Sequence, residues 1–302
     1  VRRLLASAGG QKDFLEPAMR YPAGNDPVYA FAGSFLIVRK DMVLGVERGT
    51  DRVLFQVDVE PVAHHLDGFL LVLEKGRLRS FDPTTGEELP PVAVPATACD
   101  VSGTGADPIV QLQCGNRPAV FRKARTTAEY TAPVGAKMIA LNSGADAKTS
   151  YAVYVANKIT VLDSELKAKA DFTAPSRIED LRVADDGSRI ILKTASELIF
   201  LSADSLSEER SVALRGRKAV LASQPILVSG NTVDLFSNEG KEIGSFKLPE
   251  NPFSLETISV VSSDRISFIG RNRQLLLVNK EGQVLLRENL SGASIYSIRI
   301  GK

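Results

Sequence analysis

The sequence is poor in the side chains on which many enzymes and metal sites depend. Among its 302 residues are no tryptophan, two histidines and two cysteines. The histidines, His64 and His65, are adjacent on an expected strand, where successive side chains face opposite sides of a sheet. They are therefore not expected to bind one metal ion or to act together on one substrate. We expect a structural role for the pair, and we predict neither a metal nor a cofactor.

The sequence also lacks a long apolar run and an excess of charge of either sign. No stretch approaches the roughly 18 apolar residues that a membrane-spanning helix requires, so none is expected. Lys and Arg total 37 against 36 for Asp and Glu, which leaves no basic excess for binding nucleic acid. The opening residues, VRRLLASAGG, contain too short an apolar run for a signal peptide, so such a peptide has been removed or was never present.

One pattern, by contrast, is repeated along most of the chain. In GRLRSFDPTTGEEL, residues 76–89, an alternating strand is followed by a turn rich in Pro, Thr and Gly and then by a second strand. The same pattern recurs at residues 158–172, 197–214, 232–248 and 273–290. Another hairpin precedes these segments, most clearly in DLRVADDGSRIILKT at residues 180–194. Each unit is therefore predicted to contain an inner, a second, a third and an outer strand.

The spacing of these units identifies the expected architecture. The polar residue that ends each third strand serves as a marker, and the spacings between successive markers are 40, 41, 39, 35 and 42 residues; the markers are Asp82, Arg122, Asp163, Ser202, Ser237 and Asn279. A period near 40 residues with four strands in each unit is typical of a β-propeller blade. We therefore predict an all-β propeller of four-stranded antiparallel blades.

The two ends of the chain bear on the number of blades. A complete unit at residues 28–59 makes seven, residues 4–22 align with a third and an outer strand, and residues 294–301 resemble an inner strand. By this register we predict eight blades in a single domain, residues 1–302, with a closing blade built from both termini that hides the open edges. Seven blades is the alternative, with the N-terminal segment packed beside the ring. A pair of β-sandwiches or a barrel would also fit an all-β pattern.

The repeats resemble those of known bacterial propellers. RVADDGSRIILKT is similar to the Asp-Gly hairpin of TolB-like and YVTN-like repeats, and GRLRSFDPTTGEEL resembles a quinoprotein-type repeat. The resemblance implies an exported protein, periplasmic or extracellular. Quinoprotein blades usually carry a tryptophan that locks neighbouring blades together, and its absence here argues against binding of pyrroloquinoline quinone. Because propellers include enzymes, receptors and scaffolds, the resemblance concerns architecture and not activity.

The two cysteines flank one expected hairpin. Cys99 and Cys114 lie on the arms of TACDVSGTGADPIVQLQC, and a wide loop would allow their Cα atoms to approach within the roughly 4.4–6.8 Å that a disulfide needs. The alternative is two buried free thiols in a reducing compartment.

Sorting the charged residues by the type of connection reveals a polarity. In a propeller, the turns between second and third strands and the links between blades open on one side, here called the connection face; the remaining hairpins open on the opposite side, here called the hairpin face. The connection face is predicted to be basic and the hairpin face acidic. The basic residues proposed to bind a ligand are Arg215, Arg217, Lys218, Arg271 and Arg273. The simpler alternative is that charged loops only keep the protein soluble.

Together these features predict a non-catalytic scaffold or binding module for a protein, peptide or glycan, with a basic face that suits an anionic partner. The alternative is a hydrolase or lyase, resembling the lactonase-type propellers, with a site at the mouth of the central channel. The sequence indicates no oligomeric state.

Overall fold

The computed structural model describes residues 2–5, 14–17, 27–31, 34–47, 52–141, 150–184, 186–221, 224–248, 255–262, 265–270, 274–289 and 298–300. Within these ranges the chain forms strands, turns and loops. This part of the chain has no helix that is long and apolar enough to cross a membrane. The prediction of an all-β fold is confirmed.

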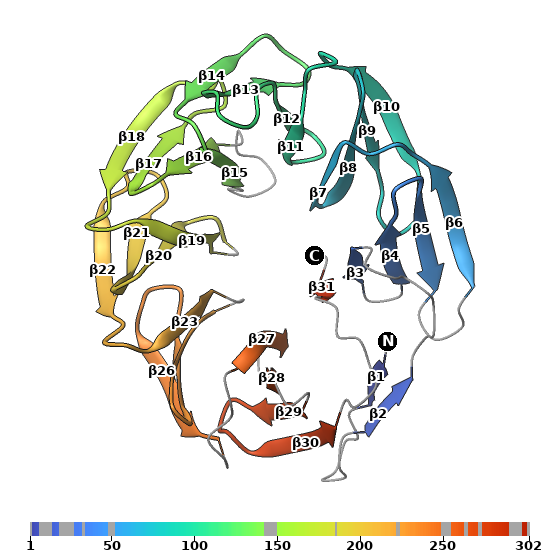
Figure 1. Ribbon diagram of the computed structural model, residues 1–302. Coiled ribbons are helices and arrows are strands. Elements are labelled where there is room, and N and C mark those ends of the chain that lie inside the picture. Colours follow the sequence, from blue (N-terminus) through green and yellow to red (C-terminus); the bar gives the residue numbers. More distant parts are fainter. Residues whose placement is uncertain are drawn as a thin grey trace.

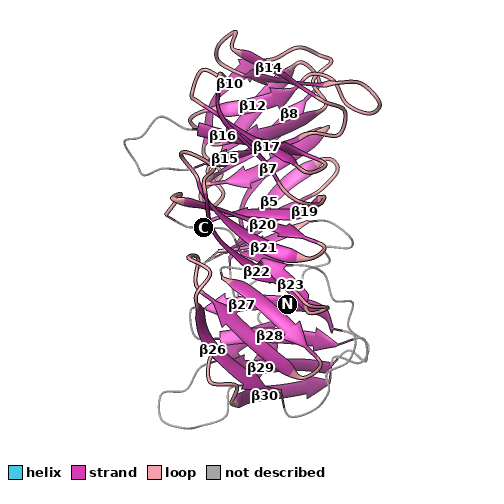
Figure 2. Cartoon of the chain, turned by 90° about the vertical axis from the view of Figure 1, so that its left-hand side faces the viewer, coloured by secondary structure: helices cyan, strands magenta, loops and turns pink. Residues whose placement is uncertain are grey.

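Seven sheets, each containing four consecutive antiparallel strands, are arranged radially around a common axis (Figure 1). Seen edge-on, the sheets form a disc with loops on both sides (Figure 2). Blade 1 contains β3 (Val28–Ala30), β4 (Ser34–Val38), β5 (Met42–Glu47) and β6 (Val53–Asp58); blade 2 contains β7 (Ala63–Asp67), β8 (Phe69–Glu74), β9 (Arg77–Phe81) and β10 (Glu88–Ala93); blade 3 contains β11 (Asp100–Gly103), β12 (Pro108–Gln111), β13 (Ala119–Lys123) and β14 (Glu129–Ala132).

The next four blades repeat this order. Blade 4 contains β15 (Lys137–Leu141), β16 (Ser150–Val155), β17 (Lys158–Leu162) and β18 (Ala168–Thr173); blade 5 contains β19 (Ile178–Val183), β20 (Arg189–Thr194), β21 (Glu197–Ser202) and β22 (Glu208–Ala213); blade 6 contains β23 (Lys218–Leu221), β24 (Pro225–Ser229), β25 (Thr232–Phe236) and β26 (Glu242–Lys247); blade 7 contains β27 (Leu255–Ser262), β28 (Arg265–Gly270), β29 (Gln274–Asn279) and β30 (Val284–Asn289). The predicted four-stranded antiparallel units are confirmed.

The ends of the chain depart from the prediction. Strands β1 (Arg2–Leu5) and β2 (Phe14–Pro17) form an antiparallel pair that lies between β30 and β6 (Figure 1). The C-terminal strand β31 (Ile298–Ile300) does not join this pair; it lies parallel to β3 and extends blade 1 to five strands. The prediction that the C-terminal strand joins the N-terminal strands in a closing blade was therefore wrong, because β31 pairs with β3 and not with β1 or β2. Without β31, the inner edge of β3 would be an unpaired strand edge, and β31 supplies its backbone hydrogen-bond partners. The count of eight blades stays a prediction.

Four of the six marker residues that defined the repeat have a common structural role. Side-chain oxygens of Asp82, Asp163, Ser237 and Asn279 each accept hydrogen bonds from two backbone N–H groups in the turn that follows. For Asp163 the two distances are 2.8 and 2.9 Å. Short polar side chains stabilise tight turns in this way. The marker period therefore reports the turn between the third and outer strands.

The hydrophobic core lies between neighbouring blades. One cluster joins Leu36 of blade 1 to Leu70 and Phe81 of blade 2, and another joins Ile159 of blade 4 to Ile190 of blade 5. Further clusters join blades 2 and 3, 3 and 4, 5 and 6, and 6 and 7, so the sheets of blades 2 to 6 bury apolar side chains on both of their faces. Burial of this apolar surface is the main force that closes the ring.

Phenylalanine and glycine make close contacts between neighbouring blades. Phe55 on β6 packs against Gly86 in the β9–β10 turn of blade 2, where a Cβ atom would lie 2.4 Å from the Phe55 ring. Phe246 on β26 packs in the same way against Gly282 in the β29–β30 turn of blade 7. Both glycines have a positive φ, +76° and +81°. The turn glycine thus permits both the backbone bend and the approach of the neighbouring ring.

Candidate binding surface

The described part of the connection face contains a group of exposed cations on blades 4, 5 and 6, here called the basic sector. Lys137 begins β15 and Lys158 begins β17, while Arg177 and Arg215 lie in the links that lead to β19 and β23. All four side chains are exposed, and none forms an ion pair with a residue that the structure describes. Cations without an ion-pair partner attract anions to a surface, and this attraction weakens as the ionic strength rises.

The structure places three of the five predicted binding residues. Arg215 is exposed in the β22–β23 link, and Lys218 begins β23 with an exposed side chain. Arg217 is occupied within the protein: its Nη1 lies 3.0 Å from Asp234 Oδ2, and its Nε and Nη2 donate to the backbone carbonyl groups of Leu214 and Ala213. Arg217 is therefore placed to hold the link in position. Arg271 and Arg273 lie outside the described residues.

Three cations of the basic sector, Lys137, Lys158 and Arg177, were not among the predicted binding residues. Lys137 and Lys218 both occupy the first position of an inner strand, two blades apart. Arg177 directly precedes the inner strand β19. The start of each inner and third strand, taken from the repeat, was the signal that could have found them.

Blades 1 and 2 give the connection face a different character. A groove of about 660 Å³ is lined by four acidic and two basic residues; its lining is Asp41, Asp58, Val59, Glu60, Val62, Glu74, Lys75 and Arg77. Burial alone would raise the pKa of Glu74, but hydrogen bonds from Arg77 and from the Glu60 backbone N–H hold that pKa below its ordinary value. In the described part of the connection face, the predicted basic character is therefore offset by carboxylates on blades 1 and 2.

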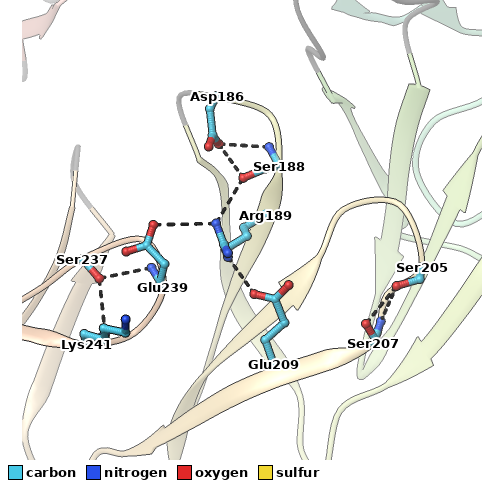
Figure 3. A network of polar contacts seen from close by, with 9 residues as sticks. All are labelled: Asp186, Ser188, Arg189, Ser205, Ser207, Glu209, Ser237, Glu239 and Lys241. Atoms are coloured by element: carbon cyan, nitrogen blue, oxygen red, sulfur yellow. Dashed lines mark hydrogen bonds and ion pairs between the residues drawn. The ribbon is translucent and has the colours of Figure 1, made fainter.

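Several charged residues of the hairpin face are engaged with one another. Arg189 on β20 donates from Nε to Glu209 Oε2 at 2.7 Å and lies 3.7 Å from Glu239 of the next blade (Figure 3). Asp186 accepts hydrogen bonds from the backbone N–H and hydroxyl groups of Ser188 in the same turn (Figure 3). These carboxylates stabilise turns and link blades 5 and 6.

A more buried polar group joins blades 3 and 4 near the hairpin face. The Tyr151 hydroxyl donates to Asp107 Oδ2 at 2.6 Å, and Lys123 Nζ lies 2.8 Å from the same carboxylate oxygen. Lys123 Nζ also donates to the Ser164 carbonyl group at 2.8 Å. Burial, followed by the hydrogen bond to Asp107, raises the pKa of Tyr151 far above its ordinary value. Each of these buried polar groups has a partner, as blade packing requires.

The histidines and cysteines also have defined positions. His64 Nε2 lies 3.0 Å from the Tyr29 hydroxyl oxygen and thereby links blades 1 and 2. Cys99 and Cys114 form a disulfide, with their Cα atoms 6.3 Å apart. Within the described ranges, no group of three or more His, Cys, Asp or Glu side chains is arranged to hold a metal ion.

Comparisons with known proteins support the class of fold. No family model and no curated protein sequence matches the chain. Among solved structures, BamB from Moraxella catarrhalis has a TM-score of 0.57 and 14% identity, with 97% of this chain and 92% of that chain covered. The C-terminal WD40 domain of Sif2 has a TM-score of 0.56 and 10% identity, with 83% and 81% covered. NirN, a dihydro-heme d1 dehydrogenase, has a TM-score of 0.56 and 12% identity, with 90% and 67% covered.

At these identities the likeness concerns the fold alone. Together with the radial sheets, it defines the chain as a β-propeller. Because one of the similar structures is a dehydrogenase, the fold does not by itself choose between a binding module and an enzyme.

Proposed function

We propose that this protein is a non-catalytic β-propeller binding module that docks an acidic protein or peptide on the basic sector of its connection face. The observation that carries the proposal is the contrast between the two faces. Lys137, Lys158, Arg177 and Arg215 are exposed without ion pairs to described residues. Toward the hairpin face, Arg189 and Lys123 form ion pairs. There, hydrogen bonds in the turns lower the pKa of Asp163 and Glu239, and the exposed Lys167 and Lys241 lie close enough to lower the pKa of these carboxylates further. Cations that stabilise no internal contact remain available to a partner.

The expected strength of this interaction follows from the exposure of the charges. An exposed ion pair contributes about 0.2–1 kcal/mol, so reversing three cations is expected to weaken binding by about tenfold or more. The effect is expected to shrink as salt is added, because the screening length is about 8 Å at 0.15 M ionic strength.

A labelled hexaglutamate peptide tests the proposal by fluorescence anisotropy, with a hexalysine peptide as the probe of opposite charge. The triple variant Lys137→Glu, Arg177→Glu and Arg215→Glu is expected to lose about tenfold in affinity for hexaglutamate. The control reverses three exposed cations of hairpin-face turns, by Arg125→Glu, Lys167→Glu and Lys241→Glu, and gives the same net charge. Equal losses in the two triple variants, or no binding of hexaglutamate by the unaltered protein, would contradict the proposal.

We also propose that the protein is exported. The repeat resemblance favours export, and disulfides persist in oxidising compartments such as the periplasm. The test is to alkylate free thiols when the cells are lysed, purify the protein and count its alkylated cysteines by mass spectrometry. Two oxidised cysteines are expected, and two free thiols would contradict export.

We further propose that the β1–β2 pair is the remainder of an eighth blade. Its position between β30 and β6 supports this assignment (Figure 1). Removal of residues 1–22 is then expected to lower the melting temperature. An unchanged melting temperature would favour a segment that only packs beside seven blades.

A further inference from the structure

One turn on the connection face differs from its counterparts in the other blades. The turn between β12 and β13 contains seven residues, 112–118, whereas the equivalent turns of blades 2, 4, 5 and 6 contain two and that of blade 1 contains three. A tight two-residue turn is sufficient to join these strands. The additional residues of blade 3 therefore serve a purpose other than strand connection.

The turn of blade 3 is exposed and yet tied to the blade at several points. Every residue from 113 to 118 is exposed. At its base, the Leu112 N–H donates to the Val120 carbonyl group at 2.8 Å, and Gln111 Nε2 donates to the Gln113 carbonyl group at 2.8 Å. Near its tip, the disulfide joins Cys114 to Cys99, directly before the inner strand β11. Since the exposed residues bury little apolar surface, these covalent and hydrogen-bonded ties define the conformation of the turn.

The side chains that this turn presents are suited to a peptide. Gln113 and Asn116 offer amide groups that both donate and accept hydrogen bonds, as a peptide backbone does. Arg117 offers a planar guanidinium group and forms no ion pair with a described residue. Such a group binds a carboxylate through two parallel hydrogen bonds, which a lysine cannot do.

The turn is also continuous with the basic sector along the ring. The next link on the connection face, residues 133–136, joins blade 3 to blade 4 and leads directly to Lys137. In this link Val134 is a large apolar residue with 49% of its surface exposed. Arg117, Val134 and Lys137 thus provide cationic, apolar and cationic positions on adjacent blades. An acidic peptide with an apolar residue between its carboxylates complements this order.

From these features we infer that residues 113–118 form a recognition loop, in which Arg117 binds a carboxylate of an extended acidic peptide and the Cys99–Cys114 disulfide holds the loop in its binding conformation. This inference rests on the proposed function and assigns a specific element to it. A loop that is already ordered loses less conformational freedom on binding, so the disulfide strengthens binding without contacting the peptide.

The experiment measures the affinity of labelled hexaglutamate for variants of the loop. Arg117→Ala is expected to weaken binding about fivefold to tenfold, and Arg117→Lys, which keeps the charge but loses the bidentate geometry, is expected to recover only part of that loss. The matched control is Arg125→Ala, because Arg125 is an exposed arginine in the β13–β14 turn of the same blade but on the hairpin face. This control is expected to bind like the unaltered protein.

A second measurement tests the role of the disulfide. The double variant Cys99→Ser and Cys114→Ser is expected to bind about tenfold more weakly, and mild reduction of the unaltered protein is expected to do the same. Thermal melts monitored by circular dichroism establish that each sample is folded at the assay temperature. Agreement between the variant and the reduced protein separates loss of the bond from an effect of the serines.

The outcomes distinguish this inference from the proposed function. If the triple variant of the basic sector loses affinity while Arg117→Ala and the disulfide variant bind normally, the recognition loop is refuted and the basic sector stands. If Arg125→Ala loses as much affinity as Arg117→Ala, the effect is one of net charge, and the loop is likewise refuted. If the unaltered protein does not bind hexaglutamate, both proposals fail.

Discussion

The contact between Phe55 and Gly86 provides a sharp test of how neighbouring blades are joined. In the variant Gly86→Ala, the new Cβ atom would lie 2.4 Å from Cγ of Phe55, which is far inside van der Waals contact. The backbone at this position has a φ of +76°, a conformation that alanine adopts only with strain. The substitution therefore combines a backbone cost with a packing cost at the junction of blades 1 and 2.

Each cost has an expected size. A positive φ at a residue with a Cβ atom costs roughly 1–2 kcal/mol, and overpacking of a close contact costs about 1–3 kcal/mol. The free energy of unfolding is therefore expected to fall by about 2–5 kcal/mol. For a chain of this length, such a loss lowers the melting temperature by about 5–15 °C.

The chain offers a matched control at another turn glycine. Gly135 has a φ of +78°, and a Cβ atom added there would meet no atom within 4 Å. Gly135→Ala is thus expected to show only the backbone cost, about 1–2 kcal/mol. The excess loss in Gly86→Ala measures the contact with Phe55.

Urea denaturation of both variants, followed by circular dichroism, gives the two free energies. In a double-mutant cycle, Gly86→Ala is expected to cost less when it is combined with Phe55→Ala, because removal of the ring takes away the Cγ and Cδ2 atoms that the new Cβ atom would overlap. Equal losses for Gly86→Ala and Gly135→Ala would refute the view that this glycine is needed for blade contact.

Three further predictions concern polar contacts. Tyr151→Phe removes a hydrogen bond to Asp107 at a blade junction and is expected to lower the free energy of unfolding by about 1–2 kcal/mol, measured by urea denaturation. Glu74 has a lowered pKa in the folded state, so its contribution to stability is present above its ordinary pKa of 4.5 and is lost as the pH falls below that value. Melting temperatures of Glu74→Gln between pH 3 and 7 are therefore expected to depend less on pH than those of the unaltered protein, and an identical profile would contradict this view. Arg189→Gln breaks a partly exposed ion pair and is expected to change the free energy of unfolding by less than about 1 kcal/mol; a larger loss in urea denaturation would show a stronger link between blades.

The repeated four-stranded unit could be predicted because it depends on local interactions. Alternation along a strand, a short polar residue such as Asp163 at its end and a glycine such as Gly240 in the turn all act within a few residues. Their period is visible in a single sequence and identifies the propeller. The partner of β31 could not be predicted in this way, since the inner edge of β3 and the β1–β2 pair border the same gap in the ring (Figure 1).

The binding surface was predictable only in part, because the partners of its charges come from separate parts of the chain. The repeat correctly indicated which turns share a face, but it did not indicate which charges are free. Arg217 differs from Arg215 because Asp234, from another part of blade 6, lies within 3.0 Å of its guanidinium group. Likewise, the acidic groove of blades 1 and 2 arises from residues separated along the chain.

Local sequence patterns were enough to predict the all-β character, the four-stranded unit and the side of the ring on which each connection opens. These properties follow from strand periodicity and turn chemistry, which are local. The folded structure was needed to show that Phe55 contacts Gly86, that Arg217 is engaged while Lys137 is exposed, and that the Cys99–Cys114 disulfide ties the exposed loop of blade 3. These features depend on distances between separate blades and loops, which are fixed when packing of apolar side chains between blades closes the ring.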